Sequence, residues 1–220
     1  RPRCQFAGEM IQMDASLHPW FGGSKTTLHA AIDDATGMIA GAWFDKQETL
    51  SGYYHVFRQI LTGYGIPYIF YTDRRTVFEY KQKNSPSLEN DTFTQFGYAC
   101  KQLGVDLKTT SIPQAKGRIE RLFGTPAELR LAGISTIEQA NEFLASYLKE
   151  FNARFALDMD CTRSVFEKQP DEEKIDQFLA VITPRKVDAG HCIRFQNKYY
   201  ELKDEQGMRS DFHKGTSVMV

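Results

Sequence analysis

The first 110 residues change their hydrophobic periodicity in a fixed order, and this order limits the folds that the chain can adopt. Three short segments alternate between apolar and polar residues, as strands do, at residues 9–16, 25–33 and 37–44. Glycine-rich turn signals separate them, which predicts an antiparallel meander. A helical pattern then runs from Leu50 to Leu61 and stops at Gly63.

Two further strand patterns alternate with helices. The apolar run 68–72 is short enough for a buried strand. Residues 92–103 carry one apolar helical stripe, with Asp91 as the expected N-cap and Gly104 as the expected residue after the C-cap, and residues 105–109 form the next strand. An antiparallel start that runs into βαβ units predicts an α/β core, with a mixed sheet flanked by helices.

The pattern changes twice after this core. Ser135 and Glu138 have the spacing of a capping box and open a helix with a regular apolar side. Short β segments follow from about residue 186, including a hairpin with its turn at 196–198. We therefore expect an α/β core at 1–134, a helical connector at 135–184, and a small β domain at 185–220 that is incomplete.

Composition excludes several classes of protein. The chain has 220 residues and a net charge of −1, and no apolar run approaches the roughly 18 residues that span a bilayer. No signal peptide opens it, so the expected location is the cytoplasm. The four cysteines have no zinc-ligand spacing and are expected to be reduced. Because the sequence starts at Arg1, an upstream module is also expected.

Three acids lie at positions where a carboxylate needs an explanation. Asp14 is inside the first strand, on the face opposite Ile11 and Met13, and Asp73 ends the buried fourth strand. Glu120 follows the fifth strand on a predicted helix. Each acid alone has a structural interpretation: a turn cap or ion pair for Asp14, an Asx turn for Asp73, and a surface ion pair for Glu120.

Considered together, the three acids favour a metal site. In the predicted sheet the first strand is central, the fourth is its neighbour, and the last helix crosses their ends, so Asp14, Asp73 and Glu120 could meet. Converging carboxylates repel one another, and a divalent cation relieves that repulsion. A set of oxygen ligands suits Mg²⁺ or Mn²⁺, whereas zinc prefers the cysteine and histidine clusters that this sequence lacks.

Four motifs occur in one order along the chain: IQMDAS, AIDDATG, FYTDRR and PQAKGRIERLFGT. Together they resemble the catalytic core of the retroviral integrase superfamily, and most closely a group of bacterial insertion-sequence DDE transposases. The resemblance covers roughly residues 9–125 and weakens through the connector and the C-terminal segment. It implies an RNase H-like core followed by a connecting helix and a small β-barrel-like segment.

The resemblance also implies roles for particular residues. Asp14, Asp73 and Glu120 would be the catalytic triad and would bind two Mg²⁺ or Mn²⁺ ions. Three bases near Glu120 would bind DNA phosphates: Lys116, Arg118 and Arg121. In relatives the helix continues after the Gly-Thr pair, whereas here Pro126 follows at once, which indicates either a deletion or omitted residues.

The implied function is metal-dependent cleavage of DNA and transfer of the new 3′-hydroxyl end to target DNA, without a covalent protein intermediate. The expected partners are element ends, target DNA and further copies of the chain, in a bacterial cytoplasm. Two alternatives stay open: an RNase H-like nuclease that only hydrolyses, and a domesticated DNA-binding protein.

Two other features have competing interpretations. Asp33 and Asp34 are candidates for the additional acids that ribonuclease H enzymes use in hydrolysis, but the sequence Asp33-Asp34-Ala35-Thr36-Gly37 favours a structural turn. The C-terminal hairpin has Arg194, Lys198 and Tyr199, which either bind DNA or serve packing.

Overall fold

The computed structural model describes residues 2–21, 24–73, 94–110, 133–157, 163–204 and 206–220. The chain divides into two compact units, the first at Arg1–Leu179 and the second at Ala180–Val220. The long helix of the expected connector belongs to the first unit.

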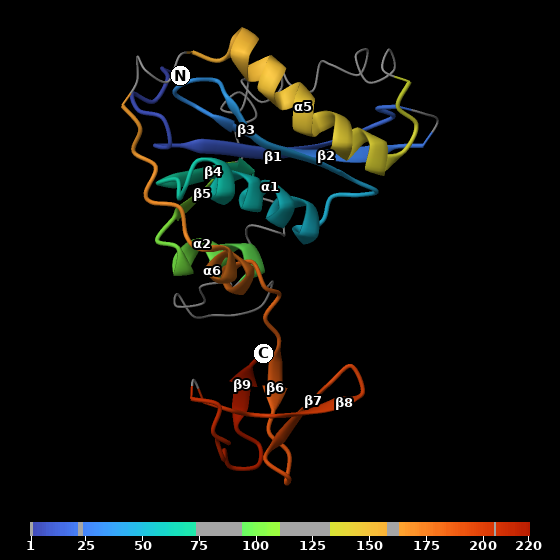
Figure 1. Ribbon diagram of the computed structural model, residues 1–220, viewed down its shortest axis with the longest axis vertical. Coiled ribbons are helices and arrows are strands. Elements are labelled where there is room, and N and C mark those ends of the chain that lie inside the picture. The colour runs from blue at the N-terminus through green and yellow to red at the C-terminus, as the bar shows by residue number, and fades with distance from the viewer. Residues whose placement is uncertain (1, 22–23, 74–93, 111–132, 158–162, 205) are drawn as a thin grey trace. The chain divides into compact units, whose positions relative to one another are not determined.

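A five-stranded sheet forms the centre of the first unit (Figure 1). Its strands are β1 (Ile11–His18), β2 (Thr26–Asp33), β3 (Ile39–Asp45), β4 (Ile69–Asp73) and β5 (Asp106–Thr110). The spatial order is β3-β2-β1-β4-β5, with β1–β2 and β2–β3 antiparallel and β1–β4 and β4–β5 parallel. The predicted meander, the central position of the first strand and the α/β class are thus confirmed.

Helices cover both faces of the sheet (Figure 1). On one face, α1 (Leu50–Gly63) and α2 (Gln95–Gln102) pack against β1 and β4 through a cluster that includes Tyr53, Phe57 and Phe96. On the other face, α5 (Ile137–Phe155) packs in a second cluster around Phe44 and Leu144. Burial of these two apolar clusters is the main force that holds the layers together.

Of the two predictions for the ends of α2, the one for the C-terminal end was confirmed and the one for the N-cap was wrong. Thr94 is the N-cap, and its hydroxyl accepts a hydrogen bond from the Gly97 N–H at 2.9 Å. The prediction of Asp91 as the cap was therefore wrong, and Asp91 itself lies outside the described residues. Gly104 has a φ of 71°, the left-handed conformation expected of the residue after a C-cap.

The capping box of α5 is displaced by one residue from the predicted pair. Thr136, not Ser135, is the N-cap and accepts from the Gln139 N–H at 3.2 Å. The Gln139 Oε1 atom in turn accepts from the Ser135 N–H at 3.1 Å. The sequence offers two equivalent capping boxes, Ser135 with Glu138 and Thr136 with Gln139. The second one forms, and with it Ala140 is buried in the core.

Two side-chain amides of α5 form hydrogen bonds with the backbone of the edge strand β3. The Phe44 N–H donates to Asn141 Oδ1 at 2.7 Å, and Asn141 Nδ2 donates to the Phe44 carbonyl at 3.1 Å. Asn152 makes the same pair of bonds with Ile39, at 2.8 and 2.9 Å. Each carboxamide thus replaces one residue of a missing neighbouring strand, which satisfies backbone groups that an open edge would expose.

A third side-chain amide, from α1, makes the same pair of hydrogen bonds with β3. Gln59 Oε1 accepts from the Ala42 N–H at 2.9 Å, and Gln59 Nε2 donates to the Ala42 carbonyl at 3.1 Å. Two helices from opposite faces therefore share the edge of β3.

Asp33 and Asp34 serve the fold, as the turn interpretation predicted. Asp33 accepts hydrogen bonds from the Thr36 N–H at 2.8 Å, the Thr36 hydroxyl at 2.7 Å and the Gly8 N–H at 2.9 Å. Asp34 accepts from the Cys4 N–H at 2.8 Å. These bonds join the N-terminal segment to the turn between β2 and β3. Burial raises the pKa of Asp33, and the hydrogen bonds oppose that rise.

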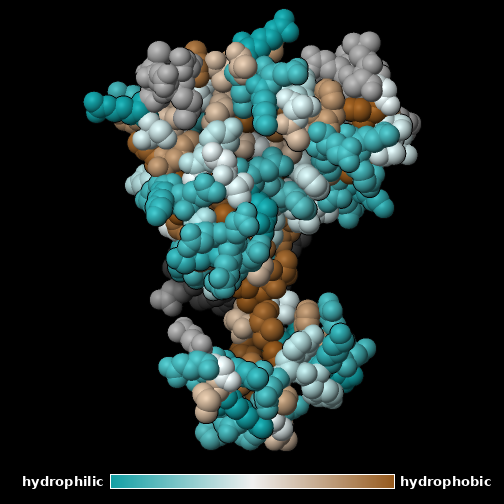
Figure 2. Space-filling model, in the orientation of Figure 1, coloured by the Kyte–Doolittle hydropathy of each residue, from teal (hydrophilic) through white to brown (hydrophobic). Residues whose placement is uncertain are grey.

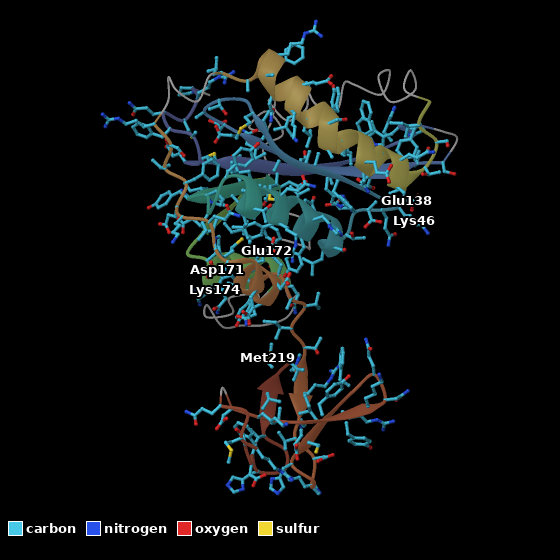
Figure 3. The ribbon with its side chains drawn as sticks, viewed as in Figure 1. Lys46, Glu138, Asp171, Glu172, Lys174 and Met219 are labelled. Atoms are coloured by element: carbon cyan, nitrogen blue, oxygen red, sulfur yellow. The ribbon has the colours of Figure 1, made fainter. Side chains whose placement is uncertain are left out.

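The short helix α6 (Glu172–Phe178) joins the first unit through α1. Arg58 of α1 pairs with Asp176, and Ile175 is fully buried. At its start, Asp171 and Lys174 form an ion pair at 3.9 Å (Figure 3). Both ion pairs are exposed, so the buried Ile175 contributes more to docking than they do.

The second unit contains two small antiparallel sheets. They pair β6 (Pro184–Lys186) with β9 (Ser217–Met219), and β7 (Cys192–Phe195) with β8 (Lys198–Glu201). Gln196 and Asn197 have φ values of 48° and 61° and form the turn of the predicted hairpin, with Lys198 already in the strand. The barrel-like closure of this unit stays a prediction.

Hydrophilic residues cover most of the face shown in Figure 2. Within the part of the chain that the structure describes, no helix has the length and apolar character needed to cross a membrane.

Candidate active site

Asp14 lies in the middle of the central strand β1. Its neighbours Met13 and Ala15 are buried in the cluster beneath α1, so the alternation of a strand turns Asp14 to the other face. The side chain is half-buried, and Oδ1 accepts a hydrogen bond from the Ala15 N–H at 2.9 Å. The carboxylate is therefore fixed locally and still partly open to solvent.

Asp73 is the last residue of β4, and it is half-buried as well. The parallel register pairs Ile11 with Phe70 and Gln12 with Tyr71, an offset of 59 positions (70 − 11). Asp14 and Asp73 have the same offset, so continuing this register by two residues brings them level. Residues at one level of neighbouring parallel strands point to the same face, about 5 Å apart.

The level of Asp73 extends to the edge strand β5. Asp73 pairs with Thr110, the last residue of that strand. Asp73 and Thr110 end their strands, and Asp14, in the middle of β1, is level with them when the β1–β4 register is continued. The carboxyl ends of β4 and β5 form the edge at which α/β sheets bind ligands.

The remaining predicted site residues lie outside the described residues. They are Glu120, Lys116, Arg118 and Arg121. In the sequence they follow Thr110, the last described residue before them and the partner of Asp73.

Glu48 and Tyr53 belong to the same region, and no motif or spacing in the sequence pointed to them. The fully buried Tyr53 donates its phenol hydrogen to Glu48 Oε1 at 2.8 Å. Burial raises the pKa of Tyr53, and the negative charge of Glu48 raises it further, with smaller contributions from Asp14 and Asp73.

The oxygen ligands suit a hard divalent cation. Two half-buried carboxylates at one level of the sheet repel each other, and Mg²⁺ or Mn²⁺ binds such oxygens. Among the described residues, no group of three or more histidine, cysteine, aspartate or glutamate side chains gathers as a metal site. Glu120, the expected third ligand, is outside that part of the chain.

Comparison with known proteins identifies the relatives of the chain. No family model matches it. Over 225 aligned residues it is 54% identical to the transposase for insertion sequence IS1202 of Streptococcus pneumoniae. The chain is a homologue of insertion-sequence transposases. A putative transposase, y4bF of Sinorhizobium fredii (strain NBRC 101917 / NGR234), is 34% identical over 164 residues.

The alignments cover this homologue better than they cover its relatives. They include 100% of the chain but 48% of the IS1202 transposase, and 71% of the chain but 35% of y4bF. The chain thus spans about half the length of the IS1202 transposase and about a third of y4bF.

A solved structure supports the fold prediction. A chain of the simian T-cell lymphotropic virus intasome, solved in complex with PP2A regulatory subunit B56 gamma, superimposes with a TM-score of 0.52. Sequence identity is 16%, and the match covers 92% of this chain and 72% of that chain. The similarity concerns the fold, and it supports the predicted mixed sheet flanked by helices.

Proposed function

We propose that this chain is the catalytic part of a DDE transposase, which cleaves DNA and transfers the resulting 3′-hydroxyl end to target DNA. The observation that supports this most is the parallel β1–β4 register, whose continuation makes Asp14 and Asp73 level. Homology to insertion-sequence transposases supports DNA as the substrate class of the proposal.

Asp14, Asp73 and Glu120 would hold two divalent cations, Mg²⁺ or Mn²⁺. The first two acids fit this role because they are half-buried oxygen ligands from adjacent strands. Glu120 would be the third ligand. When bound, the cation pair supplies electrostatic stabilisation of both the entering and the leaving oxygen in an in-line displacement.

The reaction has two displacements at phosphorus. First, a water oxygen bonds to phosphorus at the element end, and the bond to the 3′-oxygen breaks, so that a 3′-hydroxyl is released. Second, that 3′-oxygen bonds to a target phosphorus and displaces a target 3′-oxygen, which takes up a proton. The chain's carboxylates orient these oxygens, and no protein side chain forms a covalent bond to DNA.

Three bases would hold the DNA beside the acids. Lys116 and the two arginines Arg118 and Arg121 flank Glu120 in the sequence, where charge-assisted hydrogen bonds to phosphates would offset the negative charge of the site. Two element ends must be joined to one target, so we also propose that the chain acts as a homo-oligomer on DNA, in the bacterial cytoplasm.

The test is a joining assay with the terminal DNA sequences that flank the coding sequence of the element. A labelled duplex with a recessed 3′-hydroxyl is incubated with plasmid DNA, the protein and Mn²⁺. Covalent transfer of the label into the plasmid supports the proposal, whereas nicking without transfer would indicate a nuclease that only hydrolyses.

Glu120→Gln is the decisive variant, because it removes one negative charge and keeps the size of the side chain. It should abolish joining and leave the melting temperature and most of the DNA affinity unchanged. Normal joining by this variant would refute the assignment of Glu120, and DNA binding that continues without joining in the wild type would favour a non-catalytic binding protein.

A further inference from the structure

A buried hydrogen bond fixes a fourth carboxylate near the two aspartates. Tyr53 in the first turns of α1 has no exposed surface, and its phenol donates to Glu48 Oε1 at 2.8 Å. The Glu48 side chain is half-buried and lies just before the N-cap Thr49. A buried phenol needs an acceptor, so this bond limits the Glu48 carboxylate to one position.

The backbone around Glu48 is fixed as well. The Thr49 N–H donates to His29 Nε2 at 3.1 Å, and the Thr49 hydroxyl donates to Asp45 Oδ2 at 2.6 Å. The same hydroxyl accepts from the Gly52 N–H at 3.0 Å, which closes the N-cap of α1. The segment that holds Glu48 is therefore attached to β2, β3 and α1 at once.

Packing brings this segment to the strands of the proposed site. Tyr53 belongs to the same apolar cluster as Met13 and Phe70, one from each of the strands that contain Asp14 and Asp73. The charges of both aspartates also raise the pKa of the Tyr53 phenol, after the larger effects of burial and Glu48. The strand register gives the geometric link: His29 pairs with Ala15, the residue after Asp14, and the His29 ring accepts from the N–H of Thr49, the residue after Glu48.

We propose that Glu48 is a positioning residue of the metal site: held by Tyr53, its negative charge strengthens the attraction of Asp14 and Asp73 for a divalent cation. This inference rests on the proposed function, because it needs the two aspartates to bind metal. Glu48 is not proposed as a ligand, since no described group of three acids has the geometry of a metal site. Its effect is exerted through the electric field.

The test measures Mn²⁺ binding to the full chain without DNA, so that activity is not the readout. Glu48→Gln keeps an oxygen that accepts from Tyr53 and removes one charge. A unit charge that acts on a divalent ion across a partly hydrated gap of roughly 10 Å changes its affinity by about tenfold, so the Kd for Mn²⁺ should rise about tenfold. Electron paramagnetic resonance of free Mn²⁺ gives this Kd.

Two control variants make the result decisive. Glu150→Gln removes the same charge from an exposed position of α5 and should leave the Kd unchanged. Asp14→Asn should abolish binding, and Mn²⁺ binding that survives in this variant refutes the metal site and with it the proposed function. Loss of binding in Asp14→Asn together with a wild-type Kd in Glu48→Gln overturns only the inference about Glu48.

A second signature separates an electrostatic role from a structural one. Added salt screens charges over roughly 10 Å, so the ratio of Kd values between Glu48→Gln and wild type should shrink towards one as KCl is raised from about 0.05 to about 0.5 M. A ratio independent of salt would overturn the field mechanism. If Glu48→Gln does not fold, Tyr53→Phe decides: the unanchored carboxylate should raise the Kd, and an unchanged Kd contradicts the proposal.

Discussion

The Nε2 atom of His29 accepts a hydrogen bond from the Thr49 N–H at 3.1 Å, and the opposite ring nitrogen lies 3.3 Å from the Trp43 carbonyl. Only the neutral ring with its proton on Nδ1 satisfies both contacts. His29 has no exposed surface, and its ring packs edge-on against Tyr53 with 4.8 Å between the ring centroids. Burial lowers the pKa of His29 to about 4, and the hydrogen bond to Trp43 partly offsets this.

This histidine makes the stability of the first unit depend on pH. The folded pKa is lower than the unfolded one, so the unfolded chain binds more protons between about pH 6.5 and pH 4. The free energy of unfolding should therefore fall as the pH drops through this window, by on the order of 3 kcal/mol. Urea unfolding followed by circular dichroism at a series of pH values measures it.

His29→Gln is the matched variant for this pH dependence. The raised pKa of Asp33 acts in the opposite sense, because the folded state then binds the extra proton as the pH falls. Exposed His55 also has a lowered pKa and adds to the loss. The difference in the pH dependence of the unfolding free energy between wild type and His29→Gln isolates the contribution of His29. Equal pH dependence in both proteins would show that this prediction is wrong.

Gly52 permits the close approach of α1 to β2. A Cβ atom at this position would overlap the His29 ring. Gly52→Ala should lower the free energy of unfolding by about 3 kcal/mol, because neither the helix nor the buried ring can move freely. At Gly63, in the last turn of the same helix, an added Cβ would meet no neighbouring atom within 4 Å, so Gly63→Ala should be neutral or stabilise by up to about 1 kcal/mol. Equal effects in chemical unfolding would contradict this explanation.

The edge of β3 gives a prediction about α5. Asn141→Ala and Asn152→Ala each leave one backbone N–H and one carbonyl of the strand without their amide partner, which should cost about 2 kcal/mol. The two sites are far apart on the helix, so the double variant should show the sum. Lys149→Ala, on the exposed side of α5, is the control and should change the free energy of unfolding by less than about 0.5 kcal/mol.

Asp14→Asn tests the catalytic proposal independently of Glu120. Several kcal/mol of transition-state stabilisation should be lost with the metal site, which lowers the rate of joining at least about a thousandfold. Its melting temperature should stay near that of the wild type, because Asn keeps the local acceptor for the Ala15 N–H. A mild loss of rate would mean that Asp14 has the cap role considered for it from the sequence.

The strands and the first helix could be predicted because their signals are local. Alternation located β1, β2 and β3 to within two residues, and the stripe ending at Gly63 located α1. The level arrangement of Asp14 and Asp73 followed from topology, since a central first strand and a parallel fourth strand leave few registers.

The rest depends on tertiary contacts that leave no periodic signal. Two overlapping capping boxes at the start of α5 were equivalent locally, and packing chose between them. Glu48 and His29 acquire their roles only because the start of α1 contacts β2. The hydrogen bond that joins them runs from Thr49 to His29, which are 20 positions apart in the sequence. No spacing rule connects such positions, so neither residue could be assigned from sequence.

The two asparagines of α5 also define a length that evolution cannot easily change. They are 11 positions apart (152 − 141), and their partners Phe44 and Ile39 are 5 apart (44 − 39). Eleven helical residues and five strand residues each rise roughly 16 Å, so the spacing of the two asparagines along the helix equals the spacing of their partners along the strand. One inserted or deleted residue between the asparagines would rotate one amide by about 100° away from the strand. Homologues should therefore accept substitutions in this interval far more readily than changes in its length.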